Sequence, residues 1–218
     1  MIFDEEIRAL KEKILKMGLF VEKAISDSVK ALVERDNALA NEVIMKDHEI
    51  NALDVEIDEE CIRLIAIRQP KAKDLRLITT AMKITTDLER MGDLAVDICE
   101  RSLELNEEPP LKPYIVIPRM AEISQGMLID ILDAFVKKDI ALAYDVISRD
   151  DEVDDLTVQN FKNLLIFMIH DPKTVSRAVK ITYIAKYIER IADHATNIAE
   201  MVVYMVEGKM IRHTKVTQ

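Results

Sequence analysis

Apolar residues recur three and four positions apart along most of the chain, which is the period of an amphipathic α-helix. In residues 37–68 they follow alternating steps of four and three, and only Lys46 and Glu60 interrupt them. A similar pattern fills residues 140–170. Such a seam is typical of helices that pack lengthwise against one another. The two seams consist of Leu39, Val43, Ile50, Leu53, Ile57, Leu64 and Ile67, and of Ile140, Ala143, Ile147, Leu156, Phe161 and Met168.

Prolines and aspartates mark where these helices begin and end. All six prolines lie at the edges of periodic segments. Asp36 and Asp139 each precede an Ala- and Leu-rich run, which is where a helix takes its N-cap. Asp171 before Pro172 fits an N-cap followed by the first helical residue. The pattern predicts six helices, several of them about 45 Å long at 1.5 Å per residue, over residues 4–35, 37–68, 71–105, 118–137, 140–170 and 173–207.

The chain also repeats itself. With a shift of 103 positions, 12 of the 26 residues in 31–56 are identical to their counterparts in 134–159. With a shift of 100, seven of the 20 residues in 81–100 match 181–200. A period near 100 indicates duplication of a domain-sized unit, not a solenoid. We therefore expect an all-α fold of two tandem antiparallel three-helix bundles. The expected units are 1–105 and 118–208, with a proline-rich linker at 106–117 and a basic tail at 209–218.

Composition excludes several classes of protein. Only 4 Gly and 6 Pro occur among 218 residues, too few for a β-rich fold with many turns, and both glycine-rich nucleotide fingerprints are missing. A net charge of −10 argues against nucleic-acid binding, which needs a basic surface. No apolar stretch approaches the ~20 residues of a membrane-spanning helix, and the N-terminus lacks a signal pattern. We expect a cytoplasmic protein without membrane insertion, in which Cys61 and Cys99 are buried free thiols.

Acidic side chains form a stripe on the third predicted helix, and the stripe recurs on the sixth. Glu89, Asp93 and Asp97 are spaced four residues apart, so they share one helix face. Stacked carboxylates repel one another unless a cation or a basic group lies between them. The equivalent positions of the second unit are Glu189, Asp193 and Asn197.

A second recurring pair lies near the start of the second and fifth helices, as Asp47 with Asn51 and as Asp150 with Asp154. Because neighbouring helices run antiparallel, the start of one lies near the end of the next, and the four groups of each unit are expected to converge. Oxygen ligands suit hard divalent cations, or iron in a carboxylate-rich site. We predict a site for Fe, Zn, Mg or Mn in each unit and no organic cofactor.

Another reading of the acidic stripes needs no metal. Arg90 and Arg190 follow the first acid of each stripe, and intrahelical pairs with these arginines could neutralise the carboxylates on a solvated face. The residues alone leave both interpretations open.

The motifs around the stripes resemble the PhoU family. The resemblance rests on ERMGD at 89–93, ERIAD at 189–193 and LDVEIDEECIRLIAIRQP at 53–70 with the following KDLR at 73–76, and it covers essentially the whole chain. It implies a cytoplasmic regulator that restrains a phosphate-specific ABC transporter and signals through a sensor histidine kinase to the phosphate-starvation regulon. It also implies a homodimer, and metal ions held at E(D)xxxD motifs on the helix surfaces.

Carried over to this chain, the family motif falls on Glu89 with Asp93 and on Glu189 with Asp193. Asn197 departs from the pattern because an aspartate stands at the equivalent position of the first unit. An amide is a neutral ligand, so we expect the second site to hold a cation less tightly.

Two further functional classes remain as alternatives. A di-iron bundle enzyme uses Glu-x-x-His motifs, and none precedes the four histidines, so we predict no catalytic residues. A metal-independent helical scaffold is the other alternative, since long bundles offer broad faces to a partner. The histidines are His48, His170, His194 and His213.

Overall fold

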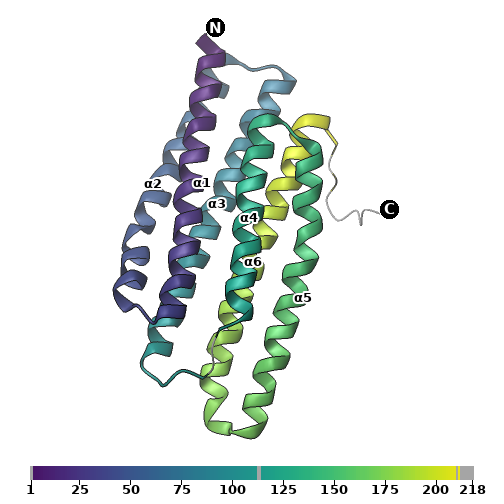
Figure 1. Cartoon of the computed structure of the whole chain (residues 1–218). Helices are drawn as coiled ribbons and strands as arrows, with labels where there is room; N and C mark the ends of the chain where they lie inside the picture. The colour runs from purple at the N-terminus through teal and green to yellow at the C-terminus, as the bar shows by residue number, and fades with distance from the viewer. Residues whose placement is uncertain (1, 112–113, 210, 212–218) are drawn as a thin grey trace.

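Six α-helices make up almost all of the computed structural model, which describes residues 2–111, 114–209 and 211 (Figure 1). No strand occurs among these described residues, so the all-α prediction is confirmed. Most of the predicted basic tail, and residues 112–113 of the predicted linker, lie outside them. The helices are α1 (Ile2–Glu34), α2 (Asn37–Arg68), α3 (Ala72–Asn106), α4 (Val116–Lys137), α5 (Ile140–His170) and α6 (Val175–Glu207), with a 3₁₀ turn η1 (Pro172–Thr174) before α6.

The helix bounds agree closely with those expected from the sequence. The bounds of α2 and α5 are the predicted ones. Helix α4 begins at Val116, two residues before the predicted start, which places Pro118 inside its first turn. Proline is tolerated there because the first backbone N–H groups of a helix have no intrahelical acceptor. The predicted segment 173–207 divides into η1 and α6.

The two interhelical turns at α1–α2 and α4–α5 have the same construction. The carboxylates of Asp36 and Asp139 each accept a hydrogen bond of 3.0 Å from a backbone N–H three residues ahead. The preceding residues, Arg35 and Lys138, adopt positive φ angles of 58° and 59°. The predicted N-caps are confirmed, and they account for long helices joined by almost no loop.

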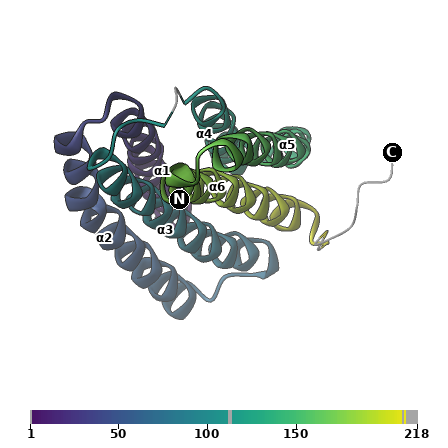
Figure 2. The ribbon, with the colours of Figure 1, turned by 90° about the horizontal axis from the view of Figure 1, so that it is seen from below.

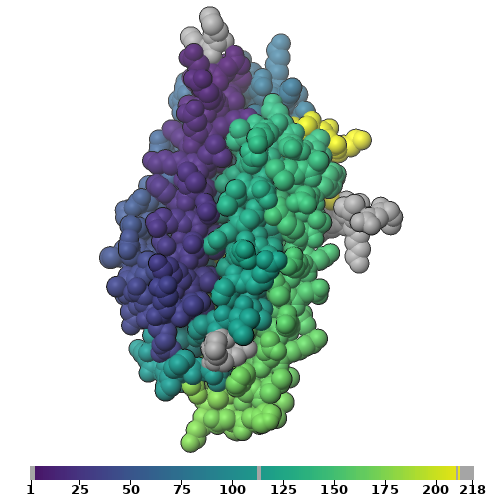
Figure 3. Space-filling model, in the orientation of Figure 1, coloured from purple at the N-terminus to yellow at the C-terminus, as the bar shows by residue number. Residues whose placement is uncertain are grey.

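The duplicated units form two three-helix bundles that lie side by side. Helices α1–α3 pack as one bundle and α4–α6 as the other, with α3 along α6 and α1 along α4 (Figures 1 and 2). Buried apolar residues from both bundles belong to one continuous hydrophobic core. The space-filling view shows α1 and α4 in contact along the front of an elongated molecule (Figure 3). The predicted architecture is therefore confirmed, with the bundles fused across α3 and α6.

The predicted seams are wrong at two positions. Ile67 is 61 % exposed and Phe161 is 46 % exposed, whereas the middle of the first seam is buried at Ile50, Leu53 and Ile57. A straight α-helix drifts by about 20° per heptad from a 4-3 ladder. Over the four heptads of the first ladder, this drift carries its last member, Ile67, out of the core. It does not account for Phe161, since Met168 follows in the same ladder and packs against the core.

A buried polar contact connects the two bundles. Nδ1 of His194 on α6 lies 2.7 Å from Oδ1 of Asp87 on α3, and both side chains are buried. The imidazole lies in the α3–α6 interface, where Asp87 is its hydrogen-bond partner. His194 therefore belongs to the junction between the halves, not to the acidic stripe.

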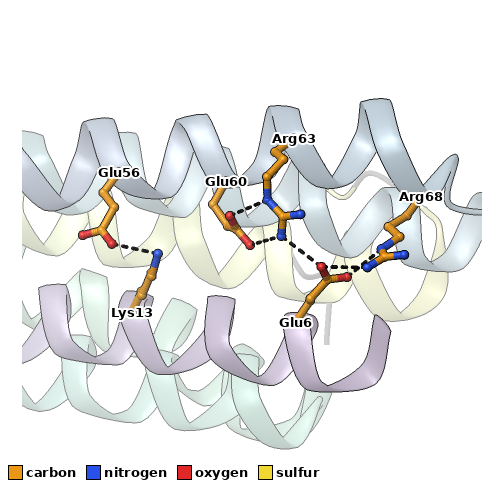
Figure 4. Close-up of polar contacts among 6 residues, drawn as sticks. All are labelled: Glu6, Lys13, Glu56, Glu60, Arg63 and Arg68. Carbon is orange, nitrogen blue, oxygen red and sulfur yellow. Dashed lines mark hydrogen bonds and ion pairs between the residues drawn. The ribbon is translucent and has the colours of Figure 1, made fainter. Parts of the chain in front are cut away.

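Ion pairs connect α1 to α2 on the outside of the first bundle (Figure 4). The carboxylate of Glu6 accepts hydrogen bonds from both Arg63 and Arg68, and Lys13 pairs with Glu56 at 2.8 Å. The arginines hold the pKa of Glu6 below its usual value, with Arg68 contributing most. These pairs join α1 to α2 at the surface, where each contributes little to stability.

Candidate functional site

The predicted carboxylates of the first bundle converge on its outer face, between α2 and α3. The antiparallel course of these helices places Asp47, near the start of α2, beside the middle of α3. Burial raises the pKa of both Glu89 and Asp93, and the negative charge of Asp47 raises both further. Asp54, one turn beyond Asn51, also raises the pKa of Glu89. We call Asp47, Asn51, Asp54, Glu89 and Asp93 the first acidic cluster.

One oxygen of this cluster has no hydrogen-bond partner. The amide of Asn51 donates to Oδ2 of Asp47 at 2.7 Å, while Oδ1 of Asp47 is buried without a partner. Gly92 permits this close approach of the helices, since a Cβ there would lie 3.0 Å from Cδ1 of Ile50 and 3.4 Å from Oδ1 of Asp47. A buried carboxylate oxygen with no donor is a place where a cation would be stabilised.

The second bundle repeats the arrangement between α5 and α6. Burial, followed by the charges of Asp193 and Asp154, raises the pKa of Asp150 to about 6. The hydroxyl of Thr196 offsets part of this pKa shift, although neither it nor Oδ1 of Asp150 completes a hydrogen bond of ordinary geometry. We call Asp150, Asp154, Glu189 and Asp193 the second acidic cluster.

The remaining pKa shifts show that the second cluster is electrostatically coupled. Burial raises the pKa of Asp154, and the charges of Glu189 and Asp193 raise it further. Burial and Glu189 likewise raise the pKa of Asp193. Lys186, one turn before Glu189, forms an ion pair with it and opposes these pKa shifts.

The last residue of each predicted stripe lies at the α3–α6 junction. Asp97 raises the pKa of Asp93 on its own helix and that of Tyr187 on α6. Asn197 lines a groove of about 620 Å³ between α3 and α6, together with Asp87 and Arg90. Asp193 of the second acidic cluster lines the same groove, so the expectation of a weaker second site stays a prediction.

Two residues that act on these sites were not predicted from the sequence, Asp54 of the first cluster and Lys186 beside the second. Asp54 lies three residues after Asn51, and Lys186 lies three residues before Glu189. Helical spacing of three was a usable signal for both. The predicted role of the arginines is a minor one, since the charges of Arg90 and Arg190 only partly offset the raised pKa values of Glu89 and Asp193.

The clusters have the chemistry of a hard-cation site without a finished coordination shell. Their ligand atoms are carboxylate and amide oxygens, their charges repel one another, and each bundle keeps one buried carboxylate oxygen unpaired. As arranged, no three acidic, histidine or cysteine side chains in the described part of the chain converge closely enough to hold an ion. Binding of a cation would therefore require carboxylate rotamers to turn inward.

A cavity adjoins the first cluster. It has a volume of about 200 Å³ between α1, α2 and α3, and Phe20, Lys23, Asp47, Ile50 and Gly92 are among its lining residues.

Cys61 and Cys99 are both buried free thiols, as predicted, and burial raises the pKa of each to about 12. Neither cysteine is therefore available as a thiolate ligand near neutral pH.

A family model described as the PhoU domain matches residues 14–102 and, a second time, residues 117–202. The chain belongs to the PhoU family. The two PhoU domains coincide with the two bundles, so the internal repeat predicted from the sequence is confirmed.

Named PhoU relatives match over nearly the whole chain. The phosphate-specific transport system accessory protein PhoU homolog of Aquifex aeolicus is 43 % identical, over 98 % of this chain and 97 % of its own. The homolog with the same name from Pseudomonas aeruginosa is 39 % identical, over 99 % and 90 %. These names describe accessory proteins, not enzymes.

Solved PhoU structures have the same fold. The crystal structure of PhoU from Pseudomonas aeruginosa superposes with a TM-score of 0.91 at 39 % identity, covering 95 % of this chain and 100 % of that one. The phosphate transport system regulatory protein PhoU from Streptococcus pneumoniae gives 0.88 at 31 % identity, covering 95 % and 98 %. In the described residues of the present chain, no helix is both long and apolar enough to cross a membrane.

Proposed function

We propose that this protein is a cytoplasmic regulator of phosphate uptake. It restrains a phosphate-specific ABC transporter and signals to a phosphate-sensing two-component kinase, acting by protein binding, as a homodimer, and not by catalysis. The observation that carries the proposal is the near full-length match to accessory and regulatory PhoU proteins. Rigid bundles with extended outer faces suit a role in protein binding.

The proposal includes a cation at each acidic cluster. Asp47, Asn51, Glu89 and Asp93 would hold it in the first bundle, with Asp54 at the edge. A bound cation supplies positive charge that relieves the repulsion among these carboxylates. The raised pKa values and the unpaired oxygens of Asp47 and Asp150 support this part of the proposal. In the second bundle the ligands would be Asp150, Asp154, Glu189 and Asp193.

Metal analysis tests the cation directly. Untagged protein purified without chelator is compared by mass spectrometry of the elements with a variant that carries Glu89→Ala, Asp93→Ala, Glu189→Ala and Asp193→Ala. We expect the variant to lose most of the bound Fe, Zn, Mg or Mn. Equal metal content in the two proteins would rule the cation out.

Deletion of the gene in the source organism tests the regulatory role. Phosphate uptake in phosphate-replete medium should rise and should return to normal on complementation with the wild type. Unchanged uptake would contradict the proposal.

The same four-residue variant separates two forms of the regulator. A metal-independent scaffold is favoured by the finding that no three ligating side chains converge in the described residues. If the variant restores normal uptake in the deletion strain, the scaffold form is correct. If it fails while remaining folded, the acidic clusters are needed for regulation.

A further inference from the structure

The second bundle exposes an apolar strip that the core does not use. Four side chains on α5 are spaced three or four residues apart, and three on α6 are spaced four apart, so each set forms one stripe. The exposed fractions reach 71 % at Ile169 and 54 % at Tyr183. We call Val158, Phe161, Leu165, Ile169, Val175, Val179 and Tyr183 the α5–α6 strip.

The two stripes lie side by side because α5 and α6 form an antiparallel hairpin. The turn between them falls at residues 171–174, so Ile169 is level with Val175 and Leu165 with Val179. Asp154 of the second acidic cluster lies four residues before Val158, so the α5 stripe continues the helix face that carries the cluster. The strip thus covers the outer hairpin surface from the cluster to the turn, at the lower end of the molecule in Figure 1.

The first bundle has the same framework, but only three of its seven equivalent positions expose a large apolar side chain, namely Val55, Ile62 and Leu75. Extending the repeat gives Asp58 in place of Phe161, Thr79 in place of Val179 and Lys83 in place of Tyr183. Core positions of the two hairpins still match, as at Cys61 with Leu164, both fully buried. Packing therefore does not demand apolar residues on this surface. The seven equivalent residues are Val55, Asp58, Ile62, Ala66, Leu75, Thr79 and Lys83.

The hairpin that carries the strip is locally basic. Residues 158–188 contain five Lys or Arg and one acid, a net charge of +4, in a chain with a net charge of −10. The equivalent residues 55–88 contain six basic and six acidic residues and are neutral. Arg177, Lys180 and Lys186 have acidic partners within the chain. Lys162 and Lys173 are exposed and form no ion pair with another described residue.

We propose that the α5–α6 strip binds an amphipathic helix of a partner protein, whose apolar face is flanked by acidic side chains. The proposal rests on the proposed regulatory function and gives the chemistry of its partner. The span from Val158 to Ile169 is about 16 Å, or three helical turns. Two parallel rows of exposed apolar side chains form a binding surface for one helix. Lys162 and Lys173 provide charges that an acidic flank would pair.

Other occupants fit this surface less well. A flat anionic bilayer would also meet the acids of residues 150–155, which continue along α5 and would be repelled. A second copy of the chain would bring the same lysines of both copies to one interface. A single helix would cover the basic, apolar part of the hairpin surface and leave the acidic part free.

Binding of a designed probe tests the proposal with the full-length protein. The probe is a fluorescent peptide of about 18 residues, with leucines at i, i+3, i+4 and i+7 and glutamates on both flanks. The matched control peptide carries lysines in place of the glutamates. We expect the acidic peptide to bind at least about tenfold more tightly, and hydrogen exchange to slow in α5 and α6 on binding.

Variants at matched positions locate the site. Leu165→Asp and Lys173→Glu should each weaken binding of the acidic peptide by about tenfold or more. The controls are Ile62→Asp, which changes the residue equivalent to Leu165, and Lys73→Glu, a basic exposed position at the other hairpin. Both controls should leave binding unchanged. All four sites are exposed, so circular dichroism should report the same helicity.

Several outcomes would overturn the proposal. The first is equal binding of the acidic and the lysine peptide, and the second is an equal loss of peptide binding in Ile62→Asp and Leu165→Asp. The third is binding of the wild type to phosphatidylglycerol vesicles that Leu165→Asp abolishes. The fourth is a change of oligomeric state in Leu165→Asp, measured by sedimentation. Failure of the regulatory proposal would be seen separately, as unchanged phosphate uptake in the deletion strain.

Discussion

The two bundles share a framework but differ on their outer faces. Their caps, turns and buried positions correspond, as Asp36 does to Asp139 and Cys61 to Leu164. Both keep an acidic cluster between their second and third helices. Beyond the clusters, the α2–α3 hairpin is mixed in charge, whereas the α5–α6 hairpin is basic and exposes the strip. Duplication has therefore preserved what folds the bundle, while surface positions free of packing have diverged.

The largest change in stability is expected at the Asp87–His194 contact, where the two bundles meet and their sequences differ. Asp87→Ala leaves His194 buried without its partner and should lower the free energy of unfolding by about 2–3 kcal/mol. The first half has Leu94 at the position equivalent to His194. Adding His194→Leu to Asp87→Ala should therefore recover most of the loss. Urea denaturation measures both, and a double variant less stable than Asp87→Ala would refute this role of the pair.

A pH-dependent effect is expected at the second acidic cluster. The pKa of Asp150 is raised to about 6 in the folded state from its ordinary value of 3.8, so the folded protein binds this proton more tightly than the unfolded chain does. The contribution of Asp150 to the free energy of unfolding is fully present below about pH 4 and is lost as the pH rises to about 6. Asp150→Asn should therefore stabilise the protein at pH 7.5 by about 1 kcal/mol, allowing for solvent screening.

Urea denaturation in EDTA at two pH values checks this prediction. At pH 4 the variant and the wild type should differ little in their free energies of unfolding. A gain from Asp150→Asn that is larger at pH 4 than at pH 7.5 would contradict the sign of the shift. A cation that binds the cluster should make the wild type more stable than Asp150→Asn at pH 7.5, since only the wild type keeps the Asp150 carboxylate.

A smaller change in stability is expected from substitutions at Gly92 and Ala192, which occupy equivalent positions of the two bundles. Ala192→Gly should cost about 1 kcal/mol, because glycine disfavours a helix interior and Ala192 is fully buried. Gly92→Ala gains the same propensity but meets the side chain of Ile50, so its net effect should stay within about 0.5 kcal/mol. Thermal denaturation of the two variants measures the difference, and equal and opposite shifts would refute the tight contact at Gly92.

The smallest effect is expected at Lys186, whose counterpart in the first bundle is Thr86. Lys186→Thr removes an ion pair between an exposed lysine and the largely buried carboxylate of Glu189, and should change the free energy of unfolding by less than about 1 kcal/mol. It should nevertheless raise the pKa of Asp193, measured by NMR titration, because the lysine lowers it. An unchanged pKa would show that Lys186 does not act on the cluster.

Local patterns predicted the elements and their order within each half. Helical period, proline positions and the Asp36 and Asp139 caps were enough for the bounds of α2 and α5. Antiparallel neighbours were enough to bring Asp47 to Glu89 and Asp150 to Asp193. These features depend on residues close in sequence or on adjacent helices, and so each could be derived without knowing how the bundles meet.

The contacts between the halves could not be derived in this way. Asp87 and His194 lie 107 positions apart, and their approach depends on how α3 is rotated against α6. The same rotation turns Asn197 into the α3–α6 groove. Phe161 was misplaced for a related reason, since a periodic pattern locates apolar stripes but does not say which stripe faces the core.

The shared core of α3 and α6 has a consequence for the origin of the chain. A single three-helix unit would expose the face of α3 that α6 now covers, and an uncovered apolar face on a small bundle favours pairing with an identical copy. The present chain has the organisation of such a pair with its two members covalently joined. Once joined, the members no longer had to be identical, and sites such as His194 and the α5–α6 strip could arise in one of them alone.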